Sequence, residues 1–236
     1  MTIKTRITHG FWSAAALAAA LASPAVAAAG APAVGDAYTY HLINGYSKEV
    51  RGQVLQEVTS TGSGRIAYSV TPDTAMAGWQ HTVVVTPEGN GLRQLIDSHG
   101  EKIAYEFAAA YPAYVFPLDA GKSWSLRVKA AVADDPRGRS VRVDGKVIGA
   151  ERIRVPAGEF DTIKVRRWVY PGDVAFMLDE TQITETDWYA PVLGRAVRTE
   201  RRSSYVDYNL CGQFPACVAH GDWDIYELVE MRVARR

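Results

Sequence analysis

The chain has 236 residues, of which 47% are hydrophobic, and its 26 basic side chains balance 26 acidic ones. A near-neutral chain with interspersed signs lacks the basic patch that nucleic acid requires, so we expect no nucleic-acid partner. Beyond the N-terminal leader, no apolar run is long enough to cross a bilayer as a helix, so the processed chain is predicted to have no integral membrane span.

Residues 1–27 have the pattern of a cleavable secretory signal peptide. Lys4 and Arg6 precede an apolar, Ala-rich run from Phe11 to Leu21, and a small-x-small pattern ends at Ala27. A membrane anchor retained at the N-terminus is the alternative. We expect cleavage after Ala27, which leaves 24 basic and 26 acidic side chains, and a periplasmic or secreted location.

The rest of the chain divides into a short lead-in and one domain. Residues 28–35 are small and include proline, and we expect a flexible lead-in there. Residues 36–236 are predicted to form a single antiparallel β domain. Its two cysteines, Cys211 and Cys217, meet an oxidising compartment after export, so we predict a disulfide that closes a C-terminal loop. Five intervening residues argue against a Cys-x-x-Cys redox motif.

Short runs of β-favouring residues, separated by turn signals, follow one another along the domain. Asn90-Gly91 and Asp144-Gly145 each predict a tight hairpin between two strands. Residues 72–78 are compatible with a loop or a helical turn, and residues 101–109 and 223–233 with a strand or a helix; for residues 223–233 the strand is preferred. We expect strands over residues 36–45, 48–60, 65–71, 79–86, 92–98, 124–133, 141–143, 146–155, 160–170, 178–189, 195–205 and 223–233.

Two more hairpins carry proline and glycine at fixed positions. Pro156 fits the first corner of a type I turn, and Gly158 fits the left-handed position that closes it. Pro191 and Gly194 set the turn between the next pair of strands. These four residues are predicted to be structural, because they specify turn geometry and carry no chemistry.

These strands predict an all-β fold. About ten to twelve strands lie close together in sequence, without a regular β–helix alternation, so the simplest architecture is an antiparallel meander. A sheet of this size curves and twists, and we expect a curved half-barrel or open barrel with at most short helical turns.

Three phrases in the sequence resemble a family of exported bacterial proteins of unknown function. They are Pro-Leu-x-x-Gly-x-x-Trp over residues 117–124, Val-Pro-Ala-Gly-x-Phe over residues 155–160, and Trp-Tyr-x-Pro-x-x-Gly over residues 188–194. The family is similar to the curved half-barrels of lipoprotein-carrier proteins, whose concave side accepts acyl chains. The resemblance implies a curved β-sheet with an apolar face, and it brings no catalytic residues. The loop between Cys211 and Cys217 is not part of the pattern.

Residues that carry chemistry are scattered along the sequence. The four histidines that remain after processing show no metal-ligand spacing, and His220 beside Asp222 and Asp224 is explained more simply as a turn after the disulfide loop. No nucleophile elbow, His-Glu-x-x-His or phosphate-binding glycine loop occurs. We therefore predict no metal, no cofactor and no catalytic residue. The histidines are His41, His81, His99 and His220.

Pairs of carboxylates occur on several predicted strands. Asp222 and Asp224 alternate and so share one face, which predicts a solvated strand edge. Asp179/Glu180 and Glu185/Asp187 have the residue types used in glycoside hydrolysis, but the simpler interpretation is charge on an exposed face that keeps the protein soluble.

Aromatic residues are more numerous than a bare scaffold needs. The structural interpretation is a sheet core with turn anchors, and it is favoured for Trp124 and Trp188. The functional interpretation is an aromatic-lined groove for an apolar ligand, for which Trp79, Trp168 and Trp223 are the candidates.

We therefore expect an exported, non-enzymatic envelope protein that binds an apolar or lipid-like ligand, or a partner protein of the envelope, on its curved sheet. The alternative is a secreted hydrolase in which histidine, carboxylate and either serine or a metal ion come together from distant positions. A structural or adhesive module is a third interpretation. The three interpretations predict different shapes for the concave side of the sheet.

Overall fold

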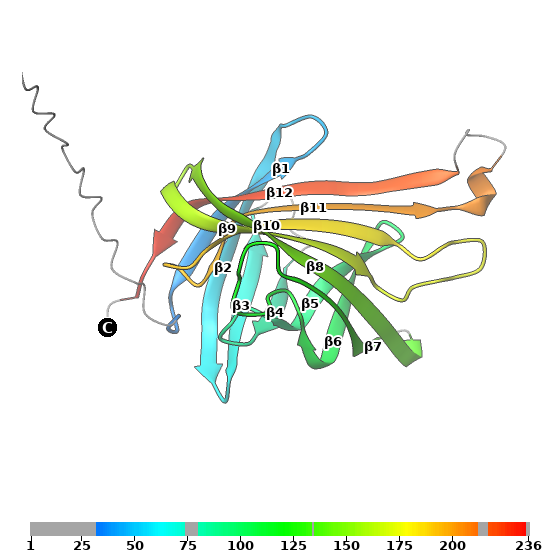
Figure 1. Cartoon of the computed structure of the whole chain (residues 1–236), viewed down its shortest axis with the longest axis horizontal. Helices are drawn as coiled ribbons and strands as arrows, with labels where there is room; N and C mark the ends of the chain where they lie inside the picture. Colours follow the sequence, from blue (N-terminus) through cyan, green and yellow to red (C-terminus); the bar gives the residue numbers. More distant parts are fainter. Residues whose placement is uncertain (1–31, 74–79, 134, 212–216, 235–236) are drawn as a thin grey trace, which may run out of the picture.

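A computed structural model of the protein describes residues 32–73, 80–133, 135–211 and 217–234. This part of the chain folds into twelve antiparallel strands and one 3₁₀ turn (Figure 1). The strands are β1 (Ala37–Asn44), β2 (Val50–Gly62), β3 (Arg65–Pro72), β4 (His81–Val85), β5 (Gly91–Ser98), β6 (Glu101–Tyr111), β7 (Ser123–Val132), β8 (Asp135–Val155), β9 (Gly158–Tyr170), β10 (Gln182–Ala190), β11 (Arg195–Val206) and β12 (Val218–Arg232), and the 3₁₀ turn η2 is Tyr208–Leu210.

The strands form a closed meander. Each strand pairs with its neighbours in sequence, and β1 pairs with β12 from Ala37–Arg232 to Asn44–Asp224, which closes the barrel. Figure 1 shows this closure as the blue strand β1 beside the red strand β12. The all-β antiparallel prediction is confirmed, and the curvature expected of the sheet is continued to closure. Closure removes the free edges that an open sheet would expose.

Most predicted strands occur within a few residues of their expected bounds. Residues 101–109 form a strand, β6, and the last segment is the strand β12 rather than a helix. Asn90 and Gly91 do lie at a hairpin, because β5 begins at Gly91 directly after the turn. Residues 74–79, which include most of the ambiguous segment 72–78, lie outside the described residues, as does the predicted leader.

The hairpin predicted at Asp144-Gly145 is wrong. Both residues lie inside the single 21-residue strand β8, which begins at Asp135. Gly145 pairs with Trp124 of β7, and a Cβ atom at Gly145 would be 2.1 Å from the indole ring of Trp124. Glycine is needed here because the Trp124 ring occupies the space that a side chain would fill.

The proline–glycine hairpins lie where the sequence places them. Val155 pairs with Gly158, so Pro156 and Ala157 form the turn between β8 and β9, and Gly158 has a φ of 135°. Gly194 precedes β11 with a φ of 63°, the left-handed conformation that glycine adopts without strain. Cys211 and Cys217 form the predicted disulfide beside η2.

The barrel interior is filled unevenly. One cluster of buried apolar side chains, centred on Tyr105, Tyr111 and Val143, occupies the side formed by β6 to β10. A second, which includes Tyr40, Val58 and Leu228, lies between β1–β3 and β10–β12. No helix in the described parts of the chain is long and apolar enough to span a membrane.

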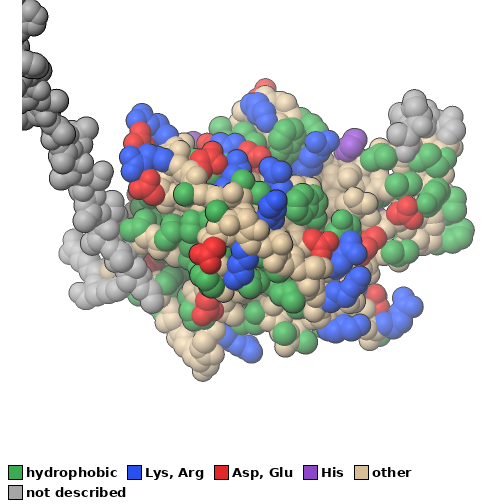
Figure 2. Space-filling view, in the orientation of Figure 1, with side chains coloured by type: hydrophobic (Ala, Val, Ile, Leu, Met, Phe, Trp, Pro, Cys, Tyr) green, Lys and Arg blue, Asp and Glu red, His purple; other side chains and the backbone are tan. Residues whose placement is uncertain are grey.

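The outside of the barrel is mixed in character. Figure 2 shows lysine, arginine, aspartate and glutamate interspersed over the visible face, with hydrophobic side chains among them. Hydrophobic side chains gather at the end formed by the β9–β10 connection, where Val174 is 71% and Phe176 is 93% exposed.

Candidate functional site

A cavity of about 260 Å³ lies inside the barrel. Side chains of β2–β5 line one side and side chains of β11 line another, and strands so far apart in the sheet can meet only across its interior. The residues described along the cavity are Tyr40, Val54, Gln56, Tyr68, Val70, Pro72, His81, Val83, Val85, Gly89, Gln94, Leu95, Lys102, Tyr114, Gly194, Arg195, Ala196, Thr199, Arg201 and Tyr226.

One wall of the cavity is apolar. Alternate positions of β2, β3 and β4 point inward, which brings Val54, Val70 and Val83 together in one hydrophobic cluster. Val85 and Leu95 continue this wall on β4 and β5. We call it the valine wall. The two-residue period of a strand explains why Val83 and Val85 share this face, and why Val54 and Gln56 do.

The opposite wall is cationic. Arg195 and Arg201 of β11 line it, and Lys102 of β6 also reaches the cavity. Tyrosines 40, 68, 114 and 226 lie between the two walls. No aspartate or glutamate occurs among the described residues that line the cavity.

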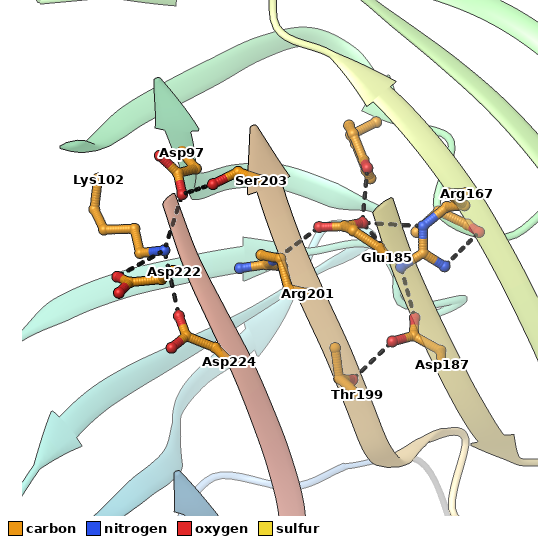
Figure 3. Close-up of polar contacts among 12 residues, drawn as sticks. Asp97, Lys102, Arg167, Glu185, Asp187, Thr199, Arg201, Ser203, Asp222 and Asp224 are labelled. Atoms are coloured by element: carbon orange, nitrogen blue, oxygen red, sulfur yellow. Dashed lines mark hydrogen bonds and ion pairs between the residues drawn. The ribbon is translucent and has the colours of Figure 1, made fainter. Parts of the chain in front are cut away.

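A buried ion-pair network lies behind the cationic wall (Figure 3). The Arg167 guanidinium on β9 donates to Glu185 Oε2 at 3.0 Å and to Asp187 Oδ2 at 2.8 Å, both on β10. Arg201 Nε donates to Glu185 Oε1 at 2.7 Å. The side chains of Arg167, Glu185 and Asp187 are at most 6% exposed. Glu185 and Asp187 are therefore not solubility charges on an exposed face, as the sequence suggested.

The network extends to two tyrosines that belong to the β6–β7 side of the molecule. Tyr111 Oη donates to Glu185 at 3.0 Å, and Tyr114 Oη donates to Asp187 at 2.6 Å. Burial, together with the neighbouring carboxylate, raises the pKa of both hydroxyls well above 10, so they remain donors. These bonds satisfy carboxylate oxygens that would otherwise be buried without partners.

Opposing effects set the charge of Glu185. Burial by itself raises the pKa of the Glu185 carboxyl, but the charges of Arg201 and Arg167 and the hydrogen bonds from Arg167 and Tyr111 lower it to about 2. Glu185 is therefore ionised at neutral pH and balances the guanidinium groups that surround it. A carboxylate in this state does not act as a general acid near neutrality.

A second polar cluster joins β12 to β5 and β6. Lys102 Nζ lies 3.3 Å from Asp224 Oδ2, 3.5 Å from Asp97 Oδ2 and 3.8 Å from Asp222 Oδ2. Ser203 Oγ donates to Asp97 at 2.6 Å (Figure 3). Asp222 and Asp224 share one face, as predicted, but the face is directed at Lys102 and the Asp224 side chain is only 1% exposed. The solvated edge predicted for this pair is therefore wrong for Asp224.

The pair Asp179/Glu180 has a different role. Asp179 accepts a hydrogen bond from the Tyr208 hydroxyl at 2.9 Å, and Glu180 accepts one from the backbone N–H of Gly172 at 2.8 Å. Both bonds hold the connection between β9 and β10 in place. The two carboxylates do not face each other across a cleft of the kind that glycoside hydrolysis uses.

The tryptophan candidates lie away from the cavity. Trp168 is 40% exposed and alternates with the buried Arg167, so it lies on the outer face, where it lines a small groove with Arg202. Trp223 alternates with Asp224 and packs against Tyr46 with ring centroids 5.5 Å apart. Trp79 lies outside the described residues. The structure thus brings neither Trp168 nor Trp223 to the cavity, and tyrosines line it instead.

The histidines are spread over the molecule. His81 lines the cavity, His41 lies on β1, His220 on β12, and His99 in the β5–β6 turn. In the part of the chain that the structure describes, no group of three or more histidine, cysteine or acidic side chains is arranged to hold a metal ion.

A serine, a histidine and an aspartate do come together near His99. Ser98 Oγ donates directly to Asp173 Oδ2 at 2.9 Å, and Asp173 also accepts from Thr181. His99 Nδ1 lies 3.7 Å from Asp173, but His99 Nε2 lies 2.8 Å from the carbonyl oxygen of Asp179. A carbonyl only accepts, so Nε2 carries the proton and is not the base that a nucleophilic serine needs. This cluster ties the β9–β10 connection to β5.

Sequence reasoning missed Arg195, Arg201 and Lys102 as residues of an internal cavity. Charged and apolar residues do not alternate regularly along β11, so its sequence carried no signal of an inner face. Nothing in the local sequence told which face was inside, because arginines occur on both.

No protein-family model matches the chain, and no curated protein matches it. The resemblance to an exported family therefore remains a prediction. Among solved structures, the chain is similar to a Bacteroides fragilis protein described as exported and having a YmcC-like fold, with 13% identity over 85% of this chain and 97% of the other and a TM-score of 0.46. A Parabacteroides distasonis protein described as a lipoprotein shows 14% identity over the same shares, with a TM-score of 0.48.

The hypothetical lipoprotein YmcC of Escherichia coli is also similar, with 10% identity over 82% of this chain and 83% of the other and a TM-score of 0.46. At these identities and scores, no conclusion about the function of this chain follows from the comparisons.

Proposed function

We propose that this chain is an exported, non-enzymatic protein of the bacterial envelope that binds an apolar or lipid-like ligand inside its barrel. The observation that carries the proposal is the cavity of about 260 Å³ with its valine wall. Burial of an apolar ligand against aliphatic side chains contributes about 25 cal/mol per Å² of surface removed from water.

The size of the cavity limits the ligand. Pockets for drug-sized molecules span roughly 300–1,000 Å³, so this cavity suits one narrow ligand, such as a single alkyl chain. The export predicted from residues 1–27 supports a role in the envelope, where ligands of this kind are abundant.

A pair of variants on β4 tests the proposal. Val83 lines the cavity, whereas Val84, the next residue, does not. Val83→Phe places a ring in the space of the ligand, and we expect it to weaken binding of the neutral fluorescent probe N-phenyl-1-naphthylamine by about tenfold or more. Val84→Phe adds the same ring outside the cavity and should leave binding unchanged.

Native mass spectrometry of the protein purified from its host should also detect a co-purified lipid, which Val83→Phe reduces. The proposal fails if no ligand is found and the wild-type protein does not bind the probe. The alternative of a hydrolase receives no support from Ser98, His99 and Asp173, whose bonds do not form a nucleophile relay. Turnover in a broad hydrolase screen that is lost in Val83→Phe would favour that alternative.

A further inference from the structure

Arg195 is a buried cation without a carboxylate partner among the described residues. It lies at the start of β11 and lines the cavity. Its Nη2 donates to Gln56 Oε1 at 2.6 Å, but its Nε and Nη1 are buried and have no hydrogen-bond acceptor in the part of the chain that is described. Buried polar groups are nearly always hydrogen-bonded, so two buried nitrogens of one guanidinium without acceptors require an explanation.

The other cations near the cavity differ from Arg195 because each has a carboxylate partner. Arg201 has Glu185 at 2.7 Å, and Lys102 has Asp224 at 3.3 Å. Both partners approach from behind the cavity wall and are not among its lining residues. The charges of Arg201 and Lys102 are therefore balanced within the protein, and the charge of Arg195 is not.

Three tyrosines surround the Arg195 guanidinium. Its Cζ lies 3.5 Å from the ring centroid of Tyr38, 5.5 Å from that of Tyr40 and 5.4 Å from that of Tyr68. The negative faces of these rings stabilise the cation in the interior. Ring faces do not neutralise its charge, so the site retains its attraction for an anion.

The cavity is therefore polarised. The valine wall offers aliphatic contacts beside the uncharged polar side chains of Gln56 and Gln94, whereas the Arg195 side offers a positive charge and hydrogen-bond donors. A ligand that matches both walls has an alkyl chain and a negatively charged end. A guanidinium can donate two parallel hydrogen bonds to a carboxylate or a phosphate, which makes these groups its preferred partners.

We propose that Arg195 binds the anionic head group, a carboxylate or a phosphate, of an amphipathic ligand whose alkyl chain lies on the valine wall. This inference rests on the proposed function, since it names the class of ligand that the same cavity holds. The head group supplies the acceptor that Arg195 lacks. Because Nε and Nη1 are buried, binding requires the side chain to rotate so that these donors face the cavity.

A ligand series on the wild-type protein tests the proposal without any substitution. Dodecanoate, dodecyl phosphate, dodecanol and dodecyltrimethylammonium share one alkyl chain and differ in head group. Each is titrated, below its critical micelle concentration, against protein loaded with N-phenyl-1-naphthylamine. We expect the two anions to displace the probe at concentrations about 10- to 100-fold lower than dodecanol, as a charged hydrogen bond predicts. The cation should be the weakest competitor.

A variant assigns the preference to Arg195. Arg195→Gln should bring dodecanoate and dodecyl phosphate to the level of dodecanol while dodecanol itself is unchanged. Arg198→Gln is the matched control, because Arg198 lies on the same strand but pairs with Glu227 and Glu200. Circular dichroism and the melting temperature show whether each variant is folded. If Arg195→Gln does not fold, the wild-type series alone decides.

The possible outcomes separate this inference from the proposed function. Equal affinity for dodecanol and the two anions, or an anion preference that persists in folded Arg195→Gln, overturns the role of Arg195 and leaves the apolar cavity standing. No displacement by any of the four compounds overturns both. A preference for dodecanoate over dodecyl phosphate, or the reverse, identifies the head group.

Discussion

Arg167, Glu185 and Asp187 place three charged side chains in the interior of the barrel. Each would be costly to bury alone, and their mutual hydrogen bonds together with those from Arg201, Tyr111 and Tyr114 offset that cost. The network as a whole contributes little net stability. Removal of one member is nevertheless strongly destabilising, because the remaining charges stay buried without a partner.

Arg167→Met should therefore destabilise the protein strongly. The change leaves Glu185 with Arg201 and leaves Asp187 with the hydroxyls of Thr199 and Tyr114. We expect a loss of about 3–5 kcal/mol in the free energy of unfolding, measured by urea titration. Arg152→Met breaks the exposed pair with Asp161 across the β8–β9 hairpin and should change stability little. Equal effects of the two substitutions would contradict the assignment of a buried network.

At the scale of elements, the hairpins and their turns explain the meander. Pro156, Gly158 and Gly194 act at turns, where backbone conformation is restricted. Gly145 acts in the middle of a strand, where the Trp124 ring needs the space of a side chain. The Trp124 indole also donates to the carbonyl oxygen of Pro112 at 3.1 Å, which ties the β6–β7 connection to the barrel.

Gly145→Ala tests this packing. The new methyl group meets the indole ring, and we expect a loss of about 1–3 kcal/mol from overpacking, measured by chemical unfolding. In a Trp124→Ala background the same change should cost much less, because the ring is gone. A double-mutant cycle isolates this coupling. If Gly145→Ala costs the same in both backgrounds, the ring is not the reason for the glycine.

At the scale of the whole molecule, closure of the barrel links charges from distant parts of the chain. Lys102 contacts Asp224, which is 122 residues away, and Tyr111 contacts Glu185. The stability of the closed barrel therefore depends on the ionisation of carboxylates that hold strands together from the inside.

The free energy of unfolding at acid pH should depend on the ionisation of Glu185. Its pKa is about 2 in the folded protein, below the value near 4.3 of an unfolded chain. The unfolded state thus binds more protons in this range, and stability is fully present above about pH 4.3 and is lost as the pH falls toward 2. Glu185→Gln should make the stability less dependent on pH in that window, measured by urea unfolding at a series of pH values. An unchanged slope would show that Glu185 does not contribute to acid unfolding.

Much of the fold was predictable from local patterns. The two-residue period predicted β1, β3 and β12, and the Asn-Gly and Pro-Ala-Gly phrases located the β4–β5 and β8–β9 hairpins, because these signals depend on neighbouring residues alone. The presence of two cysteines and the expected export were sufficient to predict the disulfide between Cys211 and Cys217. Asp144-Gly145 misled because the same dipeptide serves a turn or a glycine beneath an aromatic ring, and only the position of Trp124 distinguishes them.

The sequence by itself determined most of the strands and the turns between them, since each is encoded within a few residues; the single long strand β8 is the exception. Tertiary structure alone decided which face of each strand is inside. Alternation says that Glu185 and Asp187 share a face, but burial of that face depends on Arg167 and Arg201, which arrive from other strands. The same holds for the cavity: Arg195 and Val83 come together only because β1 pairs with β12 and closes the sheet.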